Sequence, residues 1–248
     1  EELLYKNATL LGEVTDKFEG KVNGENINLE EVETTWLNKL NPIFPYKLEE
    51  KIEIYDIKNK ISEKKIYKSS ITIAKPRVVI AAFPGTNSEY DMYNRFNENG
   101  GEAKITLLRN LTQKHLVESV DEMCKDLRNS QIFVLPGGFS AGDEPDGSGK
   151  FMAAVLQNPK LMDEIKAFLD RDGLILGVCN GFQALVKSGL LPYGEIGNVH
   201  ENSPTLTFNK IGRHISQIVK TKIVANNSPW LSSFEIGETF DIPVSHGE

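Results

Sequence analysis

After about residue 76, hydrophobic residues occur in short runs along the chain. Four runs of apolar residues, nearly unbroken, are typical of strands that are buried on both faces. They lie at residues 77–83, 105–108, 132–135 and 174–178. Helices are predicted between them at 88–100, 112–128, 151–157 and 161–169. Strands that alternate with helices predict an α/β fold, with a mostly parallel sheet covered by helices on both faces.

The clearest helix runs from Thr112 to about Arg128, where apolar residues recur at steps of three and four. Cys124 falls within this apolar stripe. A cysteine in such a position packs as a small hydrophobic residue, so we expect a buried structural thiol there.

The two ends of the chain differ from this α/β pattern. Residues 1–74 are rich in lysine and glutamate, with a strand expected at Thr9–Val14 and a short element starting at Ile27. They predict a short α+β segment ahead of the α/β domain. Beyond Asn198 the pattern becomes β-rich. Strand-like runs occur there at 205–208, 215–224 and 239–242.

Composition narrows the class of protein. The 248 residues carry 28 basic and 35 acidic side chains, a net charge of −7, which disfavours nucleic acid or an anionic membrane as the main partner. No apolar run approaches the roughly 20 residues that span a bilayer. Two cysteines are too few for a disulfide framework or a thiolate metal site, so we expect no metal and a reduced, cytoplasmic setting. The chain starts without Met and stops at Glu248, and we interpret it as a piece of a longer polypeptide.

The most informative segment surrounds Cys179. The sequence Gly177-Val178-Cys179-Asn180-Gly181-Phe182-Gln183 follows a predicted buried strand and leads into a short helix. This strand, turn and helix match a nucleophile elbow, in which glycines flank the nucleophile because larger side chains would collide with neighbouring elements. At a helix N-terminus the free N–H groups and the helix dipole stabilise a thiolate. We therefore predict that Cys179 is a nucleophile.

A thiolate nucleophile needs a histidine as proton donor, and that histidine needs an orienting group. Of the four histidines, His246 alone has a carboxylate two positions later, at Glu248. Residues i and i+2 of an extended segment point the same way, so Glu248 is expected to contact the His246 imidazole.

Acyl transfer also needs N–H groups that bind the developing oxyanion. The turn Gly137-Gly138 ends a predicted strand and leaves such groups uncovered, while the elbow geometry supplies the N–H of Asn180. Gly138 and Asn180 are therefore the expected oxyanion hole.

These residues carry a family resemblance. Cys179, His246 and Glu248, together with Gly137-Gly138-Phe139-Ser140, resemble the class I triad glutamine amidotransferases, whose fold is flavodoxin-like. Within that class the motifs are similar to the phosphoribosylformylglycinamidine synthase family in its large single-chain form. The motifs are Phe83-Pro84-Gly85-Thr86-Asn87-Ser88, Gly137-Gly138-Phe139-Ser140, Gly177-Val178-Cys179-Asn180-Gly181-Phe182-Gln183 and Ser245-His246-Gly247-Glu248.

The resemblance implies a domain division and a function. Residues 1–48 are expected to be the tail of a synthetase portion, 49–75 a linker, and 76–248 a C-terminally truncated glutaminase domain. It would hydrolyse L-glutamine through a Cys179 thioester and pass ammonia to the synthetase portion of the same polypeptide. That portion uses ATP and Mg²⁺, and no cofactor is expected in this chain. Gly137, Phe139, Ser140 and Gln183 are expected to contact glutamine.

Two other interpretations stay open. One keeps the elbow but makes the protein a cysteine hydrolase or peptidase of a related flavodoxin-like family. The other treats the segment as an inactive docking fragment of the larger enzyme.

Overall fold

The computed structural model describes residues 12–39, 41–42, 73–142 and 149–248. The chain divides into two compact units, Glu1–Ile54 and Tyr55–Glu248, which are described separately. In the first, the antiparallel strands β1 (Gly20–Val22) and β2 (Glu25–Ile27) precede helix α1 (Leu29–Asn38). The side chain of Asn28 caps α1 by accepting a hydrogen bond from the N–H of Glu31.

Part of the sequence-based division lies outside the described residues. The strand expected at Thr9–Val14 begins there, and its described residues 12–14 are not in a strand. Most of the linker expected at 49–75 lies outside as well. The boundaries 1–48, 49–75 and 76–248 therefore stay predictions.

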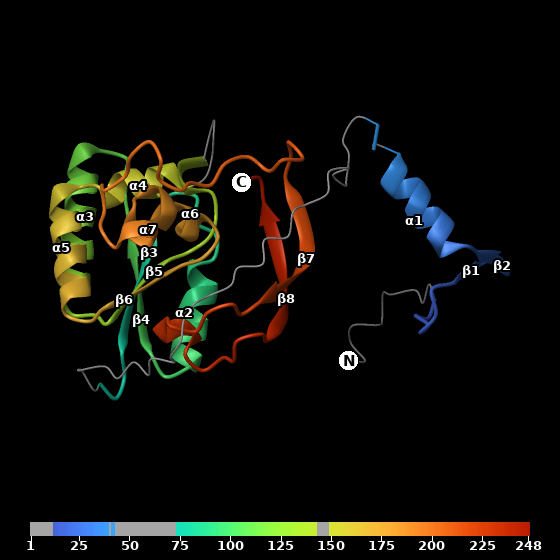
Figure 1. The fold of residues 1–248 in the computed structure, drawn as a ribbon, viewed down its shortest axis with the longest axis horizontal. Coiled ribbons are helices and arrows are strands. Elements are labelled where there is room, and N and C mark those ends of the chain that lie inside the picture. Colours follow the sequence, from blue (N-terminus) through green and yellow to red (C-terminus); the bar gives the residue numbers. More distant parts are fainter. Residues whose placement is uncertain (1–11, 40, 43–72, 143–148) are drawn as a thin grey trace, which may run out of the picture. The chain divides into compact units, whose positions relative to one another are not determined.

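The second unit is built on a four-stranded parallel sheet (Figure 1). Its strands, in the spatial order β4-β3-β5-β6, are β3 (Arg77–Ala82), β4 (Glu102–Leu107), β5 (Ile132–Leu135) and β6 (Leu174–Gly177). This confirms the predicted parallel α/β sheet. Strand β4 starts three residues earlier than its apolar run, because Glu102, Ala103 and Lys104 pair with β3 at the sheet edge, where polar side chains reach solvent.

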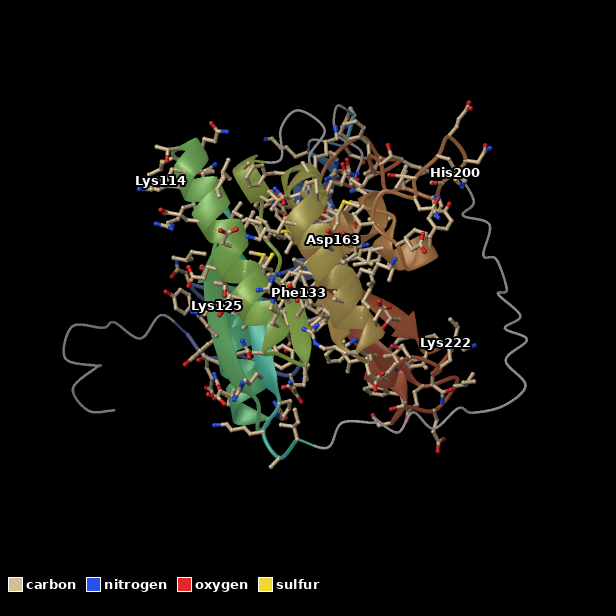
Figure 2. The ribbon with its side chains drawn as sticks, turned by 90° about the vertical axis from the view of Figure 1, so that its left-hand side faces the viewer. Lys114, Lys125, Phe133, Asp163, His200 and Lys222 are labelled. Carbon is tan, nitrogen blue, oxygen red and sulfur yellow. The ribbon has the colours of Figure 1, made fainter. Side chains whose placement is uncertain are left out.

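Helices cover both faces of this sheet, as predicted. They are α2 (Glu89–Glu98), α3 (Gln113–Arg128), α4 (Lys150–Leu156), α5 (Pro159–Asp170), α6 (Asn180–Lys187) and α7 (Leu190–Tyr193). On one face Val79 and Phe133 pack in a large core with residues of α3, α4, α5 and α6. Figure 2 looks onto this side, with α3 and α5 in front and Phe133 labelled among them. On the other face Ile80 and Val134 pack with Met92 and Phe96 of α2.

An antiparallel hairpin ends the unit. Strand β7 (Ile215–Lys222) pairs with β8 (Thr239–His246), which runs four residues beyond its predicted end because Pro243, Val244, Ser245 and His246 continue the pairing. The strand predicted at 205–208 is wrong. This segment pairs with no described strand, and the carbonyl oxygen of Leu206 instead accepts a hydrogen bond from Lys187 Nζ, at 3.0 Å. Among the described residues, no helix is both long and apolar enough to cross a membrane.

Candidate active site

Three loops converge at the carboxyl ends of the central strands. One follows β3 (residues 83–88), one follows β5 (residues 136–142), and the third is the turn from β6 into α6. The sheet order reverses between β3 and β5, which is where open α/β sheets bind ligands. The first two loops are joined by hydrogen bonds from Phe139 N–H to Gly85 O (2.8 Å) and from Asn87 N–H to Gly137 O (3.1 Å).

Cys179 lies at the turn from β6 into α6 with a strained backbone. Its φ of 52° and ψ of −111° fall in a region that residues with a side chain rarely adopt, and strain of this kind persists only where the surroundings impose it. Cys179 is the N-cap residue of α6 and is exposed. The turn therefore presents its sulfur at a helix N-terminus instead of burying it.

The two flanking glycines are required by close packing. A Cβ atom at Gly181 would lie 1.9 Å from the carbonyl oxygen of Leu135. One at Gly177 would lie 2.6 Å from Leu185 Cδ1 and 2.8 Å from Gly181 O. Helix α6 thus packs directly onto the ends of β5 and β6, at a distance that no side chain at these positions allows.

The glycine turn after β5 lies beside the cysteine. A Cβ atom at Gly137 would lie 3.2 Å from Cys179 Cβ, and Gly138 has a φ of 134° that favours glycine. The Gly137 N–H donates to Ser88 Oγ at 3.0 Å. Ser88 is the N-cap residue of α2, but its hydroxyl accepts from the Gly137 N–H and makes no capping hydrogen bond to the helix. Within the described ranges the Gly138 N–H donates to no protein acceptor.

A buried amide links the elbow to the loop after β5. Asn180 Oδ1 accepts from the Ser140 N–H at 3.2 Å, and Asn180 Nδ2 donates to Gln183 Oε1 at 3.1 Å. Asn180 and Ser140 are both buried, whereas Phe139 is 56% exposed. The structure thus brings together, around Cys179, residues expected to form the oxyanion hole and residues expected to contact glutamine.

His246 contacts an asparagine that the sequence did not single out. Asn209 Nδ2 donates to the carbonyl oxygens of His246 (2.9 Å) and Arg213 (3.0 Å), which turns Asn209 Oδ1 towards His246 Nδ1 at 3.0 Å. Because that oxygen only accepts, His246 Nδ1 carries the proton and Nε2 is left as the basic nitrogen. Asn209 is 37 residues from His246, so no local spacing indicates this contact.

Glu248 does not make the contact that its spacing predicts. Its Oε2 accepts from Lys187 Nζ at 2.9 Å, with side-chain exposures of 6% for Glu248 and 14% for Lys187. A carboxylate this buried needs a counter-charge, and Lys187 at the end of α6 supplies it. The His246–Glu248 pairing is absent from the hydrogen bonds of the described residues, and the catalytic role of Glu248 stays a prediction.

The other histidines lie in different surroundings. His214 Nε2 is 2.9 Å from Ser245 Oγ, His200 packs its ring beside that of Tyr193, and His115 lies in the first turn of α3. In the described part of the chain, no group of three histidine, cysteine, aspartate or glutamate side chains is placed to hold a metal ion.

Cys124 is buried, whereas Cys179 is exposed. It is 1% exposed in the core between α3 and α5, and its Sγ lies 3.8 Å from the carbonyl oxygen of Lys160. Burial raises the pKa of the Cys124 thiol, which keeps it protonated at neutral pH. The prediction of a buried structural thiol is confirmed.

Comparison with known proteins finds a matching domain family and similar proteins. The profile of the CobB/CobQ-like glutamine amidotransferase domain matches residues 75–248. The phosphoribosylformylglycinamidine synthase subunit PurQ of Wolinella succinogenes is 33% identical over 172 residues, which are 69% of this chain and 65% of that protein. The corresponding PurQ of Thermotoga maritima is 31% identical over 175 residues, 70% of this chain and 67% of that protein.

A solved structure is also similar. A chain in the structure of PurLQS from Thermotoga maritima superposes with a TM-score of 0.51 and 29% identity, over 70% of this chain and 67% of that chain. The chain therefore spans about two thirds of the length of the relatives it matches.

The contrast between the two cysteines predicts selective labelling. Iodoacetamide added to the native protein at pH 7.5 should modify Cys179 and leave Cys124 unmodified, because burial blocks access and keeps that thiol protonated. Peptide mass spectrometry before and after unfolding in guanidinium measures both sites. Modification of Cys124 in the native protein at the rate of Cys179 would contradict the assignment.

Gly181→Ala tests the packing of the elbow. The added Cβ would meet the Leu135 carbonyl oxygen, so we expect a loss of about 3 kcal/mol in the free energy of unfolding. Urea denaturation followed by circular dichroism measures it. Gly247→Ala is the control. Apart from its two chain neighbours, no described residue has an atom within 4 Å of its Cβ position, so the free energy of unfolding should be unchanged.

Proposed function

This chain belongs to the family of CobB/CobQ-like glutamine amidotransferase domains, and on that basis we propose that it is the glutaminase domain of a phosphoribosylformylglycinamidine synthase. The geometry of the turn at Cys179 supports this proposal most strongly. An exposed cysteine with a positive φ begins a helix, directly beside a glycine turn that presents a backbone N–H. Acyl transfer from an amide to a thiol requires this combination of nucleophile and oxyanion donors.

The proposed reaction has two steps. The Cys179 sulfur attacks the side-chain amide carbon of L-glutamine, while the N–H groups of Gly138 and Asn180 bind the oxyanion. His246 Nε2 takes the thiol proton and gives it to the departing nitrogen, so that ammonia and a glutamyl thioester form. Water, activated by the same nitrogen, then attacks the thioester and releases glutamate and the free thiol.

The hydrogen bonds around His246 support its role. Neutral imidazole acts as a base through the nitrogen that lacks a proton, and Asn209 leaves that nitrogen to be Nε2. We propose that Glu248 stabilises the His246 imidazolium. This role is supported by the family resemblance alone, because in the structure the Glu248 carboxylate pairs with Lys187.

We propose that a synthetase uses the ammonia as a reactant. The relatives are named as subunits of phosphoribosylformylglycinamidine synthase, an enzyme of purine biosynthesis, and PurLQS names an assembly that includes PurQ. We propose that a synthetase portion, with its own ATP and Mg²⁺, uses the ammonia to convert formylglycinamide ribonucleotide to the amidine in the cytoplasm. The large single-chain form, with residues 1–48 as the tail of that portion, is part of this proposal.

Cys179→Ala is the direct test of the nucleophile. We expect glutamine hydrolysis by the assembled enzyme to fall by at least about 10⁴-fold, because no thioester can form. Synthesis from added ammonia should persist, since the synthetase site is separate. Cys124→Ala is the matched control and should retain glutamine hydrolysis. Hydrolysis at the normal rate in the Cys179 variant would reject the proposal.

Glu248→Gln and Lys187→Met separate catalysis from ion pairing. Both remove the Lys187–Glu248 ion pair, but only the first removes the carboxylate proposed to stabilise His246. We expect kcat for glutamine to fall by about 10² or more in Glu248→Gln and by much less in Lys187→Met. Equal losses in the two variants would mean that Glu248 acts only through its ion pair.

A further inference from the structure

A groove with an apolar floor, called here the α5 groove, runs along helix α5. Its cavity measures about 370 Å³ and is lined by residues of α5, of α7 and of the turn after α7. Ile165 and Leu190 in its floor are buried, while Met162, Leu169 and Ile196 are partly buried. A segment bound in the groove would remove the exposed part of this apolar surface from water.

Three carboxylates surround the apolar floor. They belong to Asp163, Asp170 and Glu195, and Asp163 is labelled on α5 in Figure 2. Lys166 is the one basic side chain that lines the groove. In the described part of the chain, none of these four side chains forms an ion pair or a hydrogen bond. Since α5 ends at Asp170, the negative end of the helix dipole lies there too, and the groove favours a positively charged occupant.

The sequence contains a segment with the matching chemistry. Residues 58–68 carry five lysines and one glutamate, interspersed with Ile61, Ile66 and Tyr67. No other stretch of this length in the sequence carries as many basic side chains. The segment lies outside the described residues, within the linker predicted at 49–75. Its lysines complement the carboxylates of the α5 groove, and its apolar side chains complement the floor.

The segment is close enough along the chain to reach the groove. Ile73 lines a second cavity together with Arg171 and Asp172, so the chain at Ile73 lies beside the C-terminal end of α5. Asp170, at the near end of the groove, directly precedes Arg171. The stretch from Lys68 to Ile73 spans up to about 17 Å when extended. The groove itself extends about 12 Å along α5.

We propose that residues 58–68 bind in the α5 groove, with lysines paired to Asp163, Asp170 and Glu195 and with apolar side chains on the floor. Tethering keeps the segment at an effective concentration on the order of 1 mM or more, so a few weak surface ion pairs suffice to hold it. Binding there fixes the path by which the preceding part of the chain reaches β3. This binding is independent of the reaction at Cys179.

Carbodiimide cross-linking of the full chain measures the pairing directly. The reagent joins a carboxylate to a lysine amine where the two groups are in contact. Peptide mass spectrometry should find lysines of 58–68 joined to Asp163, Asp170 or Glu195. The yield of these products should fall about fivefold in about 1 M NaCl, because salt screens the attraction between exposed charges.

The controls separate this pairing from chance contacts. Lys220 and Asp241, 2.8 Å apart, should cross-link at low salt and show that the reagent works. Asp91 is an exposed carboxylate on α2 with no ion pair among the described residues, and it should give no product with residues 58–68. An equal mixture of unlabelled and isotope-labelled chains distinguishes a chain's own segment from that of a second copy. Products within one chain contain no mixture of the two labels.

Neutralising the groove gives a second measurement. In the triple variant Asp163→Asn, Asp170→Asn, Glu195→Gln, the lysines of 58–68 should react with acetic anhydride about fivefold faster, because they lose their partners. All three side chains are exposed, so the variant should fold. Asp91→Asn is the matched control and should leave the rate unchanged.

Four results would overturn the inference. They are the absence of groove products while Lys220 and Asp241 cross-link, products that form equally at Asp91, products that mix the two labels, and an unchanged acetylation rate in the triple variant.

Discussion

The close approach of Gly181 to the Leu135 carbonyl oxygen is the constraint on which the site depends. It brings the start of α6 onto the end of β5, where any side chain at position 181 would collide with the backbone. The chain can reach that position from β6 only through a tight turn, and Cys179 takes the positive φ that the turn requires. Packing of the core, through residues such as Ala184 and Leu135, supplies the free energy that holds this strained residue in place.

The loops beside the elbow also pack closely. Gly137 lies against the Cβ of Cys179, and the Gly137 N–H donates to the Ser88 hydroxyl. Asn180 ties Ser140 to Gln183 across the turn. The proposed nucleophile and the proposed backbone donors are thus fixed at the ends of three strands of one sheet, which is the preorganisation that acyl transfer requires.

Local patterns in the sequence predicted the parts of the structure that depend on local contacts. Apolar runs indicated all four parallel strands, and the glycines around Cys179 indicated the elbow, because both signals lie within a few residues. Contacts between distant residues were not predictable in this way. Asn209 contacts His246 although the two residues are 37 positions apart. The Glu248 carboxylate, which we expected beside His246 from their spacing, pairs with Lys187. The run at 205–208 has strand-like composition, but its Leu206 carbonyl binds Lys187 instead of a neighbouring strand.

In the proposed reaction the Cys179 sulfur forms a covalent bond to the glutamyl group of the substrate. Acid quenching of the enzyme during turnover of L-glutamine, followed by peptide mass spectrometry, measures that bond most directly. We expect a glutamyl adduct on the peptide that carries Cys179, and none on the peptide that carries Cys124. Turnover of glutamine with no adduct on the Cys179 peptide at any quench time, or with the adduct on another residue, would contradict it.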